Sequence, residues 1–275
     1  MSRIEPQDTT AEETTPQGRV TLIVLLESRE SLKRASSRIG QISGMQSVGR
    51  GVFQYAGGYA KLCETQDLPS HIALRKARSI PKVREARKSD AQARTYALVT
   101  YRFKNPTAQQ KKTVERLKRR AIAARLRPSV LLFPHIRAGE SRKRFGQDKK
   151  RPPLGSRDFA QSLSRRGAEV WRWTRLRLAN QTGQGLINRA IESTISSDID
   201  SLESKIRTLR TDLGNDDAST KKLRTRLADL RRRYKDLKMI STVVKNIWGH
   251  NADERVRRLY DLLLVARRRI SMNED

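Results

Sequence analysis

Short apolar runs alternate with helical stripes along the first half of the chain. The run at 20–26 (VTLIVLL) is continuous and rich in branched residues, and it predicts a buried strand. The next apolar residues recur at helical spacing and predict a helix that ends at Gly40. Two apolar and aromatic runs within 48–63 then flank Gly57 and Gly58, and this arrangement predicts a hairpin.

The Gly49-Arg50-Gly51 segment leaves two interpretations open. Paired glycines are typical of a simple bend, and they also let the backbone approach a phosphate. The three Phe and Tyr residues within 53–59 either fill a small core or stack on bases, as in proteins that bind single strands. We favour the bend and the core.

A second set of strands and helices follows. Residues 68–93 have apolar positions at rough helical spacing and predict a helix that Pro81 interrupts. Residues 96–103 predict a strand, 108–126 a helix with a basic outer face, and 129–133 a further strand. The helix between these two strands allows them to be parallel.

This order of elements predicts a small basic α+β sandwich over residues 19–136. It is compatible with a ferredoxin-like arrangement, a layout common in RNA-binding proteins, although fold likeness alone says little about function. The Lys/Arg-Gly-Phe/Tyr-Gly/Ala-Phe run expected of an RNA-recognition motif is missing.

The remainder, 158–275, is predicted to be a helical region. A helix is expected from Asp158, but residues 171–178 alternate apolar and basic side chains and fit a strand equally well. Within about 187–245, two Ile/Leu series at steps of three and four are separated by a polar break. Two such seams predict an antiparallel coiled-coil hairpin. A last helix after Asn251 makes this a three-helix region or a hairpin that recruits another chain.

Charge adds the clearest functional signal. The 275 residues include 59 Lys and Arg against 29 Asp and Glu, a net charge of +30. Residues 1–18 carry one base and four acids, and they predict a disordered acidic tail. Residues 19–136 carry 25 bases and seven acids. A charge of this size favours a polyanionic partner.

Residues 137–157 hold eight bases and two acids among Pro and Gly, which predicts a basic flexible linker. Its basic runs at 142–144 and 149–151 suit an arm along phosphates, a bipartite nuclear signal or a plain solvated linker. The two tryptophans within 171–173 stack on bases or pack against the neighbouring domain.

The candidate nucleic-acid contacts are the basic residues of the first bend, of the 108–126 helix, of the linker and of the tryptophan segment. They are Arg50, Lys111, Lys112, Arg116, Lys118, Arg119, Arg120, Arg142, Lys143, Arg144, Lys149, Lys150, Arg151, Arg172 and Arg175.

Catalytic patterns are absent or weak. The sequence has no Walker A, Rossmann or HExxH motif, and no apolar run long enough to span a membrane. The single cysteine, Cys63, excludes an internal disulfide and a zinc cage. Glu27 ends the first strand, where a nuclease can hold a metal ion, but Tyr101-Arg102 ends the second predicted strand. We predict no catalytic residue, metal site or cofactor.

The favoured prediction is a non-enzymatic nucleic-acid-binding subunit of a nucleoprotein complex, either a ribonucleoprotein or a DNA-binding regulator. Its helical hairpin would dock a protein partner or a second copy. The alternatives are a metal-dependent nuclease and a coiled-coil scaffold. A single cysteine and the lack of a secretory signal predict an intracellular protein, cytoplasmic or in the nucleoid or nucleus. RNA and DNA are not distinguished.

Overall fold

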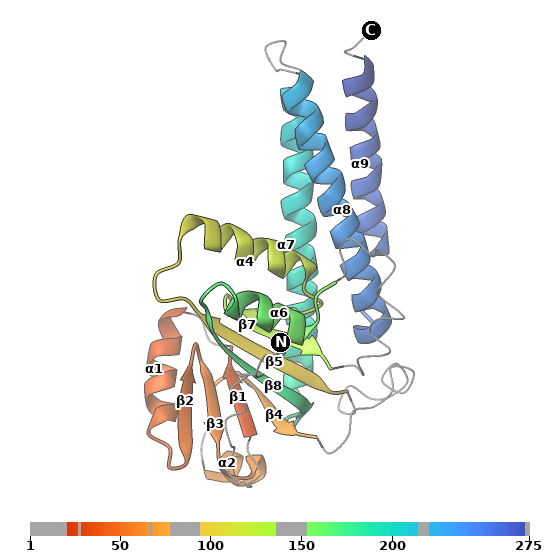
Figure 1. The fold of residues 1–275 in the computed structure, drawn as a ribbon. Helices are drawn as coiled ribbons and strands as arrows, with labels where there is room; N and C mark the ends of the chain where they lie inside the picture. Colours follow the sequence, from red (N-terminus) through yellow and green to blue (C-terminus); the bar gives the residue numbers. More distant parts are fainter. Residues whose placement is uncertain are drawn as a thin grey trace, which may run out of the picture.

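Two successive β-α-β-β-α-β units build the sheet of this chain (Figure 1). The computed structural model describes residues 21–26, 29–65, 68–77, 94–135, 153–213 and 220–272. The first unit comprises β1 (Thr21–Leu25), α1 (Arg29–Gly40), β2 (Met45–Gly49), β3 (Val52–Tyr55), α2 (Tyr59–Thr65) and β4 (His71–Lys76). The second unit comprises β5 (Tyr96–Arg102), α4 (Ala108–Arg120), β6 (Ala124–Arg127), β7 (Val130–Pro134), α6 (Ser156–Ser164) and β8 (Glu169–Leu178).

The eight strands in the described part of the chain belong to one antiparallel sheet with the order β2-β3-β1-β4-β8-β5-β7-β6. Within each unit the fourth, first, third and second strands are neighbours in that order, and the two units join along β4 and β8. The mixed α and β class predicted from the sequence is confirmed. The sheet also extends across residue 157, where the sequence analysis placed a boundary between domains.

The second and third strands of each unit form matching hairpins. The pairing of β2 with β3 shifts register between Ser47 and Gly49, and Gly49 then pairs with Val52. The pairing of β6 with β7 shifts between Arg125 and Arg127 in the corresponding place. A shared bulge of this kind bends both hairpins alike. The units therefore match in local geometry as well as in strand order.

The first hairpin was predicted in the wrong place. Its turn is Gly49-Arg50-Gly51, where three successive residues have φ values of 99°, 58° and 75°. Such backbone favours glycine, which explains both glycines of this bend. Gly57 and Gly58 instead precede α2. The neighbouring Phe53 is buried in the core beneath α1 and α2, which confirms the core interpretation for this side chain.

Three further expectations were wrong. Residues 71–76 form the strand β4 rather than a helix, while 78–93 lie outside the described residues. β5 and β7 are antiparallel rather than parallel. The predicted 108–126 helix stops at Arg120, and the following residues form β6, so the chain reverses direction once more before β7. The ambiguous segment at 171–178 lies in the strand β8.

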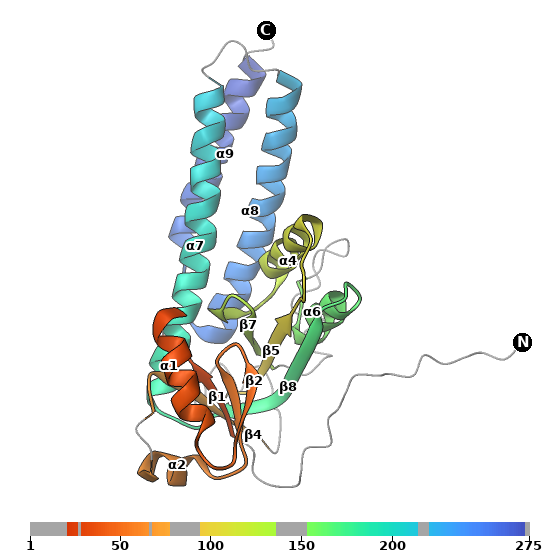
Figure 2. The same ribbon diagram turned by 90° about the vertical axis from the view of Figure 1, so that its left-hand side faces the viewer.

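Helices cover both faces of the sheet (Figures 1 and 2). On one face, α1 and α2 pack over the first unit, and α4 and α6 pack over the second. On the other face lie α7 (Thr182–Asp212), α8 (Thr220–Trp248) and α9 (Asp253–Met272), which extend beyond the sheet as a group of long helices (Figure 2). No helix in the described ranges is long and apolar enough to cross a membrane.

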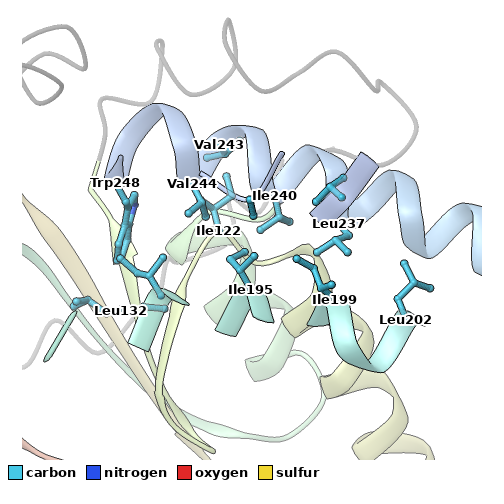
Figure 3. Packing of buried hydrophobic residues seen from close by; sticks show 14 of the residues in the cluster. Ile122, Leu132, Ile195, Ile199, Leu202, Leu237, Ile240, Val243, Val244 and Trp248 are labelled. Atoms are coloured by element: carbon cyan, nitrogen blue, oxygen red, sulfur yellow. The ribbon is translucent and has the colours of Figure 1, made fainter. Parts of the chain in front are cut away.

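One continuous core joins this helical group to the sheet. It contains sheet residues such as Leu132 together with Ile195 of α7 and Val244 of α8 (Figure 3). Trp248, at the end of α8, packs edge-on against Tyr96 of β5 with ring centroids 6.0 Å apart. The Ile and Leu positions predicted to form two seams are buried here, apart from the partly buried Leu213 at the end of the first.

Candidate nucleic-acid interface

The helix α4 carries six of the fifteen basic residues predicted from the sequence to contact nucleic acid. Thr107 starts it with a capping box: its hydroxyl accepts from the Gln110 N–H at 3.1 Å, and the Gln110 side chain accepts from the Thr107 N–H at 2.8 Å. Val114 and Leu117 are buried against the sheet. The other sides carry six basic residues and one acid, Glu115, which pairs with Lys118 at 2.9 Å.

α4 packs against α8, and the contact gathers like charges from three helices. Burial lowers the pKa of Arg233 on α8, and the nearby Arg119 and Arg116 of α4 lower it further, against an opposing effect of Asp229. Burial also lowers the pKa of Lys205 on α7, with Arg233 and Arg119 adding to the effect. We call these four bases the junction cluster. Its members are Arg116, Arg119, Lys205 and Arg233.

A hollow lies beside the junction cluster, and Arg119 and Arg233 both line it. Two acids, Asp198 and Asp236, line it as well, and the carboxylate of Asp198 pairs with Arg125 of β6 at 2.8 Å. Burial raises the pKa of Asp198, and Arg125 opposes that rise. Asp198 thus joins α7 to the edge strand β6, where the Thr194 hydroxyl also accepts from the Arg125 N–H at 3.0 Å. The nearby Arg119 also acts to lower the pKa of Asp198.

The exposed side of α8 continues this basic surface and was not among the predicted contacts. The helix carries ten basic residues and two acids. At least three of the bases have acidic partners, since Arg226 pairs with Asp212, Arg232 with Asp229 and Lys245 with Asp253. The basic run 231–233 is visible in the sequence, but it lies within a segment whose apolar seam dominates the pattern. The exposed bases of α8 are Lys221, Lys222, Arg224, Arg226, Arg231, Arg232, Lys235, Lys238 and Lys245.

Arg50 lies near Tyr101 of β5, a residue on which Lys118 of α4 also acts. The buried Tyr101 of β5 has a raised pKa because of its burial, and Lys118 and Arg50 both act to lower it. The Tyr101 hydroxyl donates to the carbonyl oxygen of Pro128 at 3.1 Å, in the second hairpin. The fold therefore brings Arg50 and α4, which are far apart in sequence, to one region. Together with the junction cluster and the exposed bases of α8, they form what we call the α4–α8 surface.

Arg172 and Arg175 lie elsewhere, on the central strand β8. Both are exposed, and the Arg172 Nε donates to the Ser156 hydroxyl of α6 at 3.1 Å. Arg175 has a φ of 56° at an irregularity in the pairing of β8 with β5. Its N–H donates to Nδ1 of His135 at 3.1 Å. Burial lowers the pKa of His135 to about 4, and Arg172, Arg175 and Lys76 add to that effect.

The linker candidates at 142–144 and 149–151 lie outside the described residues, as does Glu27. His71 uses both ring nitrogens to join α2 to β4, at 2.7 Å from the Pro69 carbonyl oxygen and 2.9 Å from the Tyr59 hydroxyl. Within the described ranges, no three His, Cys, Asp or Glu residues lie close enough together to hold a metal ion. Comparisons with protein-family models, curated proteins and solved structures find no match to this chain.

Proposed function

We propose that this chain is a nucleic-acid-binding protein and that the α4–α8 surface holds the phosphate backbone. The observation that carries this proposal is the packing of α4 against α8, which places Arg119 and Arg233 around one hollow. Arg116 and Lys205 lie near enough to add to the electrostatic effect there. Like charges held together cost stability, and a polyanion would reverse that cost. Arg is well suited to this contact because its planar fork binds phosphate with two hydrogen bonds.

The dimensions of α8 favour an extended ligand. Its 29 residues span about 43 Å at 1.5 Å per residue. That length corresponds to roughly a dozen nucleotides at 3.4 Å per nucleotide of one strand. We therefore expect affinity to rise with oligonucleotide length up to about this size.

We further propose that each β-α-β-β-α-β unit is a ferredoxin-like fold and that the α7–α8 pair is an antiparallel coiled-coil hairpin. The strand order and antiparallel pairing support the first assignment, and the buried Ile and Leu positions support the second. The apolar side of this hairpin packs within the chain, so a protein partner of the 187–245 segment would meet polar and basic residues. We expect such a partner within an intracellular nucleoprotein complex.

The test uses the full chain with all four junction-cluster residues changed: Arg116→Gln, Arg119→Gln, Lys205→Gln and Arg233→Gln. Binding to fluorescent RNA and DNA oligonucleotides is measured by anisotropy from 50 to 300 mM salt. We expect affinity to fall at least tenfold and the slope of log K against log salt to become shallower by about three. The melting temperature should stay unchanged or rise, because the variant removes repulsion.

The matched control removes the same charge from α9, at the exposed residues Arg257, Arg267, Arg268 and Arg269. Its affinity should change by less than threefold. The proposal is wrong if the two variants lose affinity equally, since net charge would then explain the binding without a site. It is also wrong if the wild-type protein binds neither RNA nor DNA at 50 mM salt.

A further inference from the structure

A pair of arginines faces each other at the junction of the two units. Arg75 of β4 pairs directly with Arg177 of β8, the strands that join the halves of the sheet. Directly opposed side chains of an antiparallel pair have Cβ atoms only about 5 Å apart, and like charges there are destabilising. Arg75 is exposed and Arg177 is half-buried. The Arg177 Nε is buried and has no hydrogen-bond partner among the described residues.

The pair faces the side of the sheet that carries α1, α2, α4 and α6. Leu74, Leu176 and Leu178 belong to the core beneath α7–α9, and side chains alternate along a strand. Arg75 and Arg177 therefore point the other way, onto the face toward the viewer in Figure 1, where β4 and β8 are labelled. On that face, His71 of β4 contacts α2, and Arg172 of β8 contacts α6. The pair thus lies between the helices of the first unit and those of the second.

Other bases extend the pair along β8. Arg172 and Arg175 are exposed on the same strand, and burial together with the nearby Arg157 lowers the pKa of Arg172. One carboxylate, Asp158, opposes that effect. The irregular backbone at Arg175 shifts the side-chain alternation of β8 by one residue, and Arg172 therefore faces α6. We call this group of four arginines the seam strip. Its members are Arg75, Arg172, Arg175 and Arg177.

We propose that the seam strip is a second phosphate-binding site, which holds the backbone of the nucleic acid where the two units meet. This inference rests on the proposed function, but it concerns a different group of residues from the α4–α8 surface. A phosphate between Arg75 and Arg177 would convert a repulsive cross-strand pair into a bridged one. It would also offer an acceptor to the guanidinium of Arg177.

The experiment compares the full chain with the double variant Arg75→Gln and Arg177→Gln. Anisotropy with a fluorescent 20-nucleotide RNA and its DNA counterpart is measured across the same salt series. We expect a loss of affinity of three- to tenfold and a slope shallower by about one to two. The control double variant Lys33→Gln and Arg34→Gln on α1 removes the same charge from exposed positions, and we expect less than a twofold change.

A third variant, Arg75→Glu, separates binding from folding. It places an opposite charge across from Arg177, so the melting temperature should rise while affinity falls at least as far as in the double variant. If Arg75→Glu lowers the melting temperature, the arginine pair is structural and the proposal fails.

The two proposals fail in different ways. If the seam double variant binds as tightly as wild type while the junction-cluster variant loses affinity, the seam strip is not a site and the proposed function stands. If the wild-type protein binds no nucleic acid, both are overturned. Inorganic phosphate alone is also tested as a competitor of the oligonucleotide, at concentrations that leave the salt dependence of binding unchanged. If it competes, the seam strip binds a free anion and the nucleic-acid assignment is overturned.

Discussion

His135 should make the stability of this protein depend on pH in a predictable direction. Its Nδ1 accepts a hydrogen bond from the Arg175 N–H. Protonation of Nδ1 would therefore place two hydrogen-bond donors, the ring N–H and the Arg175 N–H, opposite each other. Burial, together with three nearby bases, lowers its pKa to about 4. The unfolded chain, with a pKa of about 6.5, takes up the proton first as pH falls. Stability from this group is therefore present above pH 6.5 and is lost between pH 6.5 and 4.

The size of the effect follows from the two pKa values. Between pH 6.5 and 5.0, proton uptake by the unfolded state favours unfolding by about 2 kcal/mol at 1.36 kcal/mol per pH unit. The His135 ring is partly exposed, so solvent screening reduces the expected loss to about 1 kcal/mol. The variant His135→Gln keeps a side-chain acceptor for the Arg175 N–H but has no titrating group.

Urea unfolding at pH 7.5 and pH 5.0, for wild type and for His135→Gln, isolates this contribution. Carboxylates that also titrate at low pH cancel in the difference between the two proteins. We expect wild type to lose about 1 kcal/mol more than the variant on acidification. An equal loss in both proteins, or a larger loss in the variant, would refute the reasoning.

Three further predictions concern the hydrophobic core and its sharing between the sheet and the helices α7–α9. Ile206→Ala, at a fully buried position of α7, should lower the free energy of unfolding by about 2–5 kcal/mol, whereas the exposed Ser204→Ala should change it by less than about 0.5 kcal/mol in the same urea titration. The Asn180 side chain accepts from the Ala73 N–H at 2.9 Å and donates to the His71 carbonyl oxygen at 3.0 Å. Asn180→Ala would leave these buried backbone groups unpaired, so it should lower the free energy of unfolding by about 2–4 kcal/mol in calorimetry or urea unfolding. A fragment of residues 19–180 contains every strand but lacks α7–α9, so it should bind the dye ANS strongly and should give no cooperative thermal transition.

The sequence predicted elements best where periodicity was strong. The 20–26 run, the helix ending at Gly40 and the Ile and Leu stripes of α7 and α8 were found because burial on one side leaves a clear pattern. β4 was missed because its first four residues, from His71 to Leu74, are buried on both faces and therefore show no alternation. The end of α4 was missed because Ala121 and Ala124 fit the helical stripe, although these residues belong to the core beside and within β6.

The repeated unit was hidden for a different reason. Its signature is strand order and a shared hairpin bulge, and neither requires the two halves to share residues: Gly49-Arg50-Gly51 turns the first hairpin and Pro128-Ser129 turns the second. The junction cluster and the Arg75–Arg177 pair were hidden because each depends on contacts between distant segments. For α4, composition was enough, since six bases on one short helix are visible without its neighbours.

The way this fold covers its sheet also determines what kind of nucleic-acid contact is available. Helices pack on both faces, and the large aromatic side chains Phe53, Tyr96, Phe133 and Phe159 are fully buried. Tyr260 is the one exposed aromatic residue in the described part of the chain. Bases therefore have few described surfaces on which to stack, while Arg and Lys side chains line α4, α8 and β8.

Contacts to phosphate position a ligand without reading its sequence. Under the proposed function, we expect oligonucleotides of equal length and different base composition to bind within about threefold of one another at fixed salt, because backbone charge would supply nearly all of the affinity. A preference of more than about thirtyfold for one sequence, which corresponds to roughly 2 kcal/mol, would require base contacts that these surfaces do not offer.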